Sequence, residues 1–178
     1  MELPHAFRTD RLGPLTIPLH GLHAMALSHG EEQFARKGKC PPTFLLAVGF
    51  DVIWVEESWE SSDERGFKFQ LMREVIRVLN VRAYSFISEV YIAAASKADW
   101  ERDGPPTDLY KLPKNKRDES LWIDSWSRQG EHFTSNYLIT PRRTGLAFLG
   151  PRVDEVYKDY DEFIGRAVNL FQPPREAP

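Results

Sequence analysis

Two pairs of β-forming runs, each joined by a turn short enough to require a hairpin, constrain the fold of this chain most. The first pair covers residues 43–48 and 52–57, which are rich in β-branched and aromatic side chains. The second pair covers residues 121–128 and 132–140, on either side of a turn that contains Gly130. Apolar runs split by such a turn are typical of antiparallel neighbours. We therefore expect an antiparallel sheet built around two hairpins.

Two further segments extend this sheet. Residues 83–95 are strand formers without a breaker, which predicts one long central strand. Residues 146–149 follow Gly145 and predict a short strand that continues the meander from the second hairpin. Pro141 and Pro151 are expected to bound these edge segments, because proline cannot donate to a ladder.

Helical periodicity precedes and follows the first hairpin. Thr16 is the expected N-cap of a helix that has Pro18 in its first turn, runs to Lys37 and ends at Gly38. A second helix is expected to begin within residues 61–63 and to stop near Asn80. Its predicted buried stripe consists of Phe67, Leu71, Val75 and Leu79.

Residues 153–171 predict a third, amphipathic helix, with Asp154 and Glu155 placed favourably in its first turn. Residues 1–14 are expected to form an irregular arm, residues 15–172 a single domain and residues 173–178 a tail. Residues 98–116 predict a long, charged, proline-rich surface loop. The expected fold is α+β, an antiparallel sheet with helices packed on one face.

Composition narrows the function classes. Lys and Arg total 23 against 26 Asp and Glu, so the net charge of -3 offers no general attraction for nucleic acid. Cys40 is the only cysteine, which excludes an internal disulfide and favours a cytoplasmic protein. No apolar run reaches the ~18 residues of a membrane span, and the glycines form no phosphate-binding motif. We expect no membrane insertion and no cofactor.

Two histidines form a candidate pair of metal ligands. His20 and His23 are three residues apart in the first predicted helix, so both imidazoles could lie on one face, with Glu31 or Glu32 as a third ligand. The sequence carries no second ligand pair of the zinc-peptidase type. The alternative is that both are ordinary surface or capping histidines.

Two carboxylates in neighbouring predicted strands form the candidate catalytic or binding site. Glu89 lies in the middle of the long strand among apolar residues, and Glu119 opens the next strand. The two could approach across the ladder or share Arg117 or Arg142. If Glu89 is buried, it must be paired or protonated, and such groups are candidate acids or bases. If it is exposed, it only continues the alternation of the strand.

The predicted loop also carries the most basic segment, residues 111–117, which together with Arg142 and Arg143 could contact phosphates. Asp118 and Glu119 follow directly and cancel part of this charge, and the segment contains no aromatic side chain to stack on bases. The alternative is a solvated loop.

Tryptophans are the last notable feature, because five occur in this chain. Trp122 and Trp126 are four residues apart in a predicted strand and therefore share one face, with Asp124 between them. That face is either part of the core or an interface with another protein.

The sequence also resembles a group of uncharacterised small proteins of bacteria and their phages. The resemblance rests on Ser88-Glu89-Val90-Tyr91-Ile92, a proline-rich loop, and residues 116–121, within a region of about residues 83–149. It implies the meander and a bacterial cytoplasm but carries over no activity or catalytic residue.

These observations favour a non-enzymatic binding or assembly protein that is homo-oligomeric or bound to a protein partner. It would act through the aromatic sheet face or the loop of residues 98–117. A metal-assisted hydrolase using Glu89 and Glu119 is the first alternative. A nucleic-acid-associated protein using residues 111–117 is the second.

Overall fold

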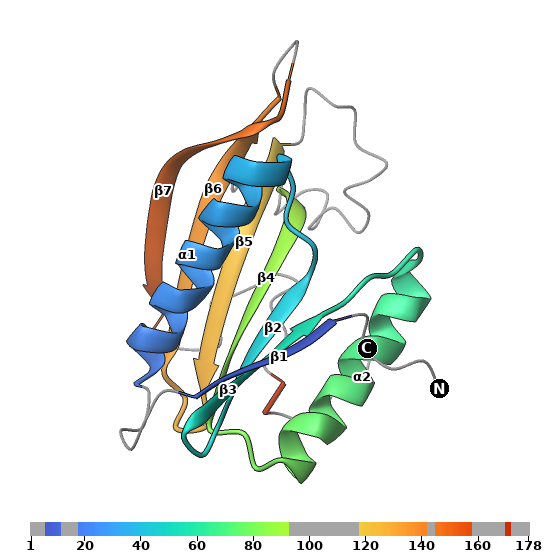
Figure 1. The fold of residues 1–178 in the computed structure, drawn as a ribbon, viewed down its shortest axis with the longest axis vertical. Coiled ribbons are helices and arrows are strands. Elements are labelled where there is room, and N and C mark those ends of the chain that lie inside the picture. The colour runs from blue at the N-terminus through green and yellow to red at the C-terminus, as the bar shows by residue number, and fades with distance from the viewer. Residues whose placement is uncertain (1–5, 12–17, 93–117, 142–144, 158–169, 172–178) are drawn as a thin grey trace, which may run out of the picture.

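The computed structural model describes residues 6–11, 18–92, 118–141, 145–157 and 170–171, in which one antiparallel sheet of seven strands is packed against two helices (Figure 1). The sheet order is β1-β3-β2-β4-β5-β6-β7. The predicted α+β class, with helices packed against an antiparallel sheet, is confirmed. The elements are β1 (Ala6–Arg11), α1 (Leu19–Lys37), β2 (Thr43–Val48), β3 (Asp51–Glu56), α2 (Ser62–Val78), β4 (Ala83–Ile92), β5 (Asp118–Ser127), β6 (His132–Thr140) and β7 (Phe148–Tyr157).

Both predicted hairpins are present. β2 pairs with β3 through a turn in which Gly49 has a φ of 59°, and β5 pairs with β6 through a turn in which Gly130 has a φ of 96°. Positive φ values cost glycine little, so each turn is possible because of its glycine. The long strand is β4, and it pairs with β5 over its whole length, from Ala83 opposite Ser127 to Ile92 opposite Asp118.

Helix α1 ends as predicted. Gly38 adopts the left-handed conformation with a φ of 66°, and its N–H bonds to the carbonyl of Phe34. The helix begins at Leu19 with Pro18 as its N-cap residue, rather than at Thr16. Gly30 faces the sheet, where a Cβ atom would lie 3.0 Å from a methyl group of Leu121. The missing side chain therefore lets the helix lie close to β5.

Helix α2 has the predicted start and a different buried face. The Ser61 hydroxyl accepts a hydrogen bond from the N–H of Glu64 at 3.1 Å. The predicted stripe is wrong, since Phe67 is 64% exposed, and the buried side chains are Met72 and Ile76. Steps of four residues turn about 40° too far each time, so a strict four-residue stripe winds around the helix. Only its middle, near Val75, contacts the core.

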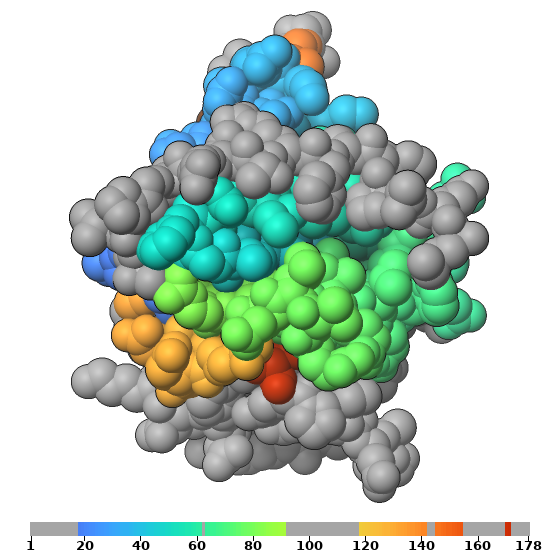
Figure 2. Space-filling view, turned by 60° about the horizontal axis from the view of Figure 1, so that its bottom comes forward, coloured from blue at the N-terminus to red at the C-terminus, as the bar shows by residue number. Residues whose placement is uncertain are grey.

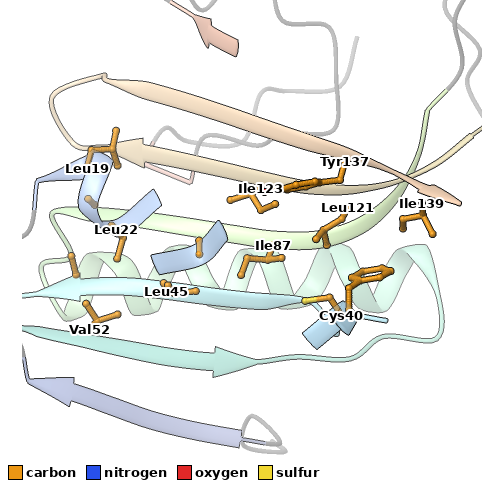
Figure 3. Close-up of a cluster of buried hydrophobic side chains, with 14 residues drawn as sticks. Leu19, Leu22, Cys40, Leu45, Val52, Ile87, Leu121, Ile123, Tyr137 and Ile139 are labelled. Carbon is orange, nitrogen blue, oxygen red and sulfur yellow. The ribbon is translucent and has the colours of Figure 1, made fainter. Parts of the chain in front are cut away.

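The two helices lie on opposite faces of the sheet, whereas we expected them on the same face. Leu45 and Ala47 of β2 pack with α1 residues in one core cluster (Figure 3). Phe44 and Leu46 point the other way and pack with Met72 of α2 in a second cluster. Alternate side chains of a strand point to opposite faces, so both faces of β2 are covered. We call these the α1 face and the α2 face.

Three further expectations need correction. Part of the predicted arm is β1, which pairs with β3 at one edge of the sheet. The start of the predicted third helix is strand, because residues 153–157 complete β7 and pair with β6. Pro151 lies inside β7, where the register with β6 shifts, rather than at its end. Residues 158–169 and the predicted loop of residues 98–116 lie outside the described part of the chain.

Neither helix of the described part of the chain is long and apolar enough to cross a membrane.

Candidate functional site

The two predicted carboxylates do come together on the α1 face. Glu89 lies opposite Leu121, so Glu119, two residues along β5, is its diagonal neighbour on the same face. The Glu89 side chain is exposed, and its Oε1 accepts a hydrogen bond from the backbone N–H of Cys40 at 2.7 Å. Partial burial of the carboxylate raises the pKa of Glu89, the charge of Glu119 adds to this, and the Cys40 N–H opposes it. Because the Glu89 side chain is exposed, it is not the carboxylate buried in an apolar layer that was the first of the two predicted cases.

Cys40 is buried beside this pair. Burial, together with the negative charge of Glu89, raises the pKa of the Cys40 thiol to about 12. The thiolate is the reactive form of cysteine, so this thiol is chemically inert at neutral pH.

The predicted histidine pair does not converge. His20 is exposed, whereas His23 is buried under α1, between β5 and β6. His23 Nδ1 bonds to the Ser125 hydroxyl at 2.7 Å, and Nε2 bonds to the Ser135 hydroxyl at 2.8 Å. Both ring nitrogens are therefore already engaged. Across the described ranges, no group of three or more histidine, cysteine or carboxylate residues could hold a metal ion.

The serines that hold His23 belong to a longer chain of hydrogen bonds. The Ser135 hydroxyl donates to Asp154 Oδ1 at 2.5 Å, and the hydroxyls of Ser85 and Ser125 bond at 2.6 Å. Because Ser135 donates to Asp154, its oxygen accepts from His23 Nε2–H, and His23 Nδ1 accepts from Ser125. The chain thus runs from β4 to the surface carboxylate on β7 with a neutral imidazole at its centre.

Electrostatics agree with a neutral His23. Burial lowers the pKa of His23, and the nearby carboxylates of Asp154 and Asp124 only partly offset this effect. Arg152 and His132 add slightly to the lowering. The chain therefore satisfies a buried polar ring and ties α1 directly to β5 and β6 and, through their serines, to β4 and β7.

A second polar cluster lies on the α2 face and was not predicted. Asp124 accepts a hydrogen bond from His132 Nε2–H and one from the Thr134 hydroxyl at 2.8 Å, both on Oδ1. Its Oδ2 accepts from Trp126 Nε1–H at 2.7 Å. The Trp126 and His132 rings stack with centroids 3.6 Å apart. The signal was present in the sequence, because these four residues alternate on the two strands of one predicted hairpin.

The two tryptophans share the α2 face, as predicted, but differ in environment. Trp126 is buried in the second core cluster with Leu170, and the Leu170 N–H bonds to the Tyr84 hydroxyl at 2.9 Å. Figure 2 shows residues 170–171, in red, between the orange strand segments and the green region of β4 and α2. Trp126 is thus a core residue, while Trp122 is only half-buried.

Beyond Trp122, the α2 face carries exposed apolar side chains. Leu138 of β6 is 45% exposed, and Phe148 and Val153 of β7 are 41% and 49% exposed. Trp122, Asn136 and Val153 lie opposite one another across β5, β6 and β7. Leu138 and Thr140 follow Asn136 on the same face of β6, and Phe148 of β7 lies opposite Thr140. We call Trp122, Leu138, Phe148 and Val153 the β6–β7 patch.

Two predicted site residues, Arg117 and Arg142, lie outside the described residues, as does the basic segment 111–117. Comparison with known proteins finds no match to this chain among family models, curated proteins or solved structures.

Proposed function

We propose that the protein is a non-enzymatic binding or assembly protein that docks a partner on the β6–β7 patch. The observation that carries this proposal is the row of apolar side chains on β6 and β7 that stay 41% to 49% exposed. Contiguous exposed apolar side chains on a sheet mark interaction sites more often than scattered ones do. α2 packs against β2, β3 and β4 on the same face.

The reactive side chains near the two faces support the same proposal. His23 and Asp124 are buried, and their polar atoms are engaged within the protein. Cys40 is buried with a strongly raised pKa. A catalytic nucleophile or base needs access to its substrate and a pKa near the working pH. In the described residues, these three groups instead stabilise the fold.

Two matched variants test the proposal. Val153→Asp places a charge in the β6–β7 patch, and Val78→Asp makes the same change at a valine of α2 that is 68% exposed and does not belong to the patch. We expect wild type and Val78→Asp to form the same complex, and Val153→Asp to lose it. The measurements are molar mass by light scattering after gel filtration and quantitative capture of proteins from a lysate of the native host. A monomeric wild type that captures the same background as Val153→Asp would contradict the proposal.

A metal-assisted hydrolase that uses Glu89 and Glu119 is the second candidate. The placement of the Glu89 and Glu119 carboxylates as diagonal neighbours on one face favours it. Calorimetric titration with Mg²⁺ and Mn²⁺ tests it, since two carboxylates on one face should bind a divalent ion and Glu89→Gln should weaken that binding. The absence of a binding heat in wild type would exclude this candidate.

A further inference from the structure

Strand β7 is the last strand in the sheet order of the described residues, and it borders the β6–β7 patch. It is ten residues long, about twice the usual strand length, and an edge of that length offers a long row of backbone groups for pairing. From this edge we infer that the partner is a second copy of this chain, paired antiparallel along β7 with Val153 on the two-fold axis. This inference rests on the proposed binding function and names its partner.

Charge complementarity selects this pairing. Arg152 and Asp154 flank Val153 and project on the α1 face, opposite Tyr137 and Ser135 of β6. Both side chains are about half exposed, and they form an ion pair at 3.0 Å within the strand. In an antiparallel pair centred on Val153, Arg152 of each copy lies directly opposite Asp154 of the other. Opposite charges in directly opposed positions stabilise a strand pair, and like charges destabilise it.

Neighbouring registers of the β7–β7 pairing do not place opposite charges across from each other. A two-fold axis perpendicular to the sheet keeps each face continuous, so a side chain can oppose only a residue of the same face. The nearest alternatives therefore centre on Arg152 or on Asp154. Each of them sets that charge against its own copy. Of the registers around Val153, only the one centred on it brings opposite charges together.

The same arrangement also brings the two β6–β7 patches together on the α2 face. Val153 of the two copies would meet on that face, so the exposed apolar side chains of the two β6–β7 patches would become one continuous surface across the axis. Pro151, two residues from the centre of the pairing, lacks a backbone N–H, and β7 departs from regular register with β6 there. The arrangement is isologous, as closed dimers require.

Two charge variants test the register. Arg152→Asp makes both flanking positions acidic, and Asp154→Arg makes both basic, so like charges would oppose each other in either homodimer. We expect each variant alone to dissociate about tenfold more readily than wild type, since two symmetric pairs change from attractive to repulsive. Mixed in equal amounts, the two variants should form a heterodimer, because each introduced charge then faces its opposite. Arg36→Asp, which changes an exposed side chain of α1, is the control and should dimerise like the wild type.

Molar mass by light scattering and native mass spectrometry of the mixture measure these outcomes. The variant proteins differ in mass, so a heterodimer is identified directly. Loss of the ion pair within β7 destabilises each chain whether it is mixed or alone, so only contact between chains explains recovery on mixing. A wild type that is monomeric but captures another protein would overturn this inference and leave the proposed function standing. A wild-type dimer that both variants retain would overturn the β7 register.

Discussion

Replacing Asp124 with alanine should strongly destabilise the fold. The carboxylate is almost fully buried and accepts hydrogen bonds from the side chains of His132, Thr134 and Trp126. Alanine leaves three buried donors without their acceptor, and each such group costs about 1–3 kcal/mol. The Thr134 hydroxyl lies 3.0 Å from His132 Nε2 and can re-pair with it, which reduces the total. We expect a loss of about 3–5 kcal/mol.

Urea denaturation followed by tryptophan fluorescence measures this loss as the change in free energy of unfolding. Asp124→Asn retains one oxygen acceptor and should lose only about 1–3 kcal/mol. Asp118→Ala, an exposed carboxylate at the start of the same strand, is the matched control and should change stability by less than about 0.5 kcal/mol. A loss below about 1 kcal/mol for Asp124→Ala would refute the view that this carboxylate organises the α2 face.

Three other predictions concern α1 and its connections. Burial lowers the pKa of His23 from 6.5, so the unfolded chain takes up this proton first as the pH falls. Stability is therefore full above about pH 6.5 and declines below it, and thermal melts should show a smaller decline for His23→Gln. Gly38→Ala should lower the free energy of unfolding by about 2–3 kcal/mol in urea titrations, because φ is 66° and the new Cβ would lie 2.8 Å from Leu146. Gly49→Ala is the control, since φ is 59° but the new Cβ would meet open space, and it should lower that free energy by only about 1 kcal/mol. Cys40 should resist alkylation in the folded protein and react in denaturant, as mass spectrometry would show.

The features that the sequence predicts correctly depend on a few neighbouring residues. Gly49 and Gly130 make the hairpin turns because positive φ is cheap only for glycine. Gly38 ends α1 and Ser61 caps α2 for equally local reasons, since each satisfies backbone groups within one turn of its helix. The signals for these features therefore lie within a few residues of one another in the sequence.

The features that were predicted wrongly depend on which other segment of the chain pairs with them or packs against them. Asp154 and Glu155 suit a helix start as well as a strand, and pairing of residues 153–157 with β6 decides for strand. Phe67 and Met72 are both apolar, and only the position of the sheet determines that Met72 is buried. β2 carries apolar side chains on both of its faces, and each face is buried only if a helix packs on it. This is why α1 and α2 lie on opposite faces of the sheet.

The same distinction between local and long-range causes applies to the candidate sites. The spacing of residues along two adjacent strands predicts that Glu89 and Glu119 share a face, because pairing and alternation are regular. It cannot predict that His23 meets two serines more than a hundred positions away, since that contact exists only once α1 lies across β5 and β6. Sequence alone thus determines the two hairpins, the long strand and the end of α1 in this protein. The tertiary structure decides which polar groups are buried and satisfied, and which apolar side chains remain exposed.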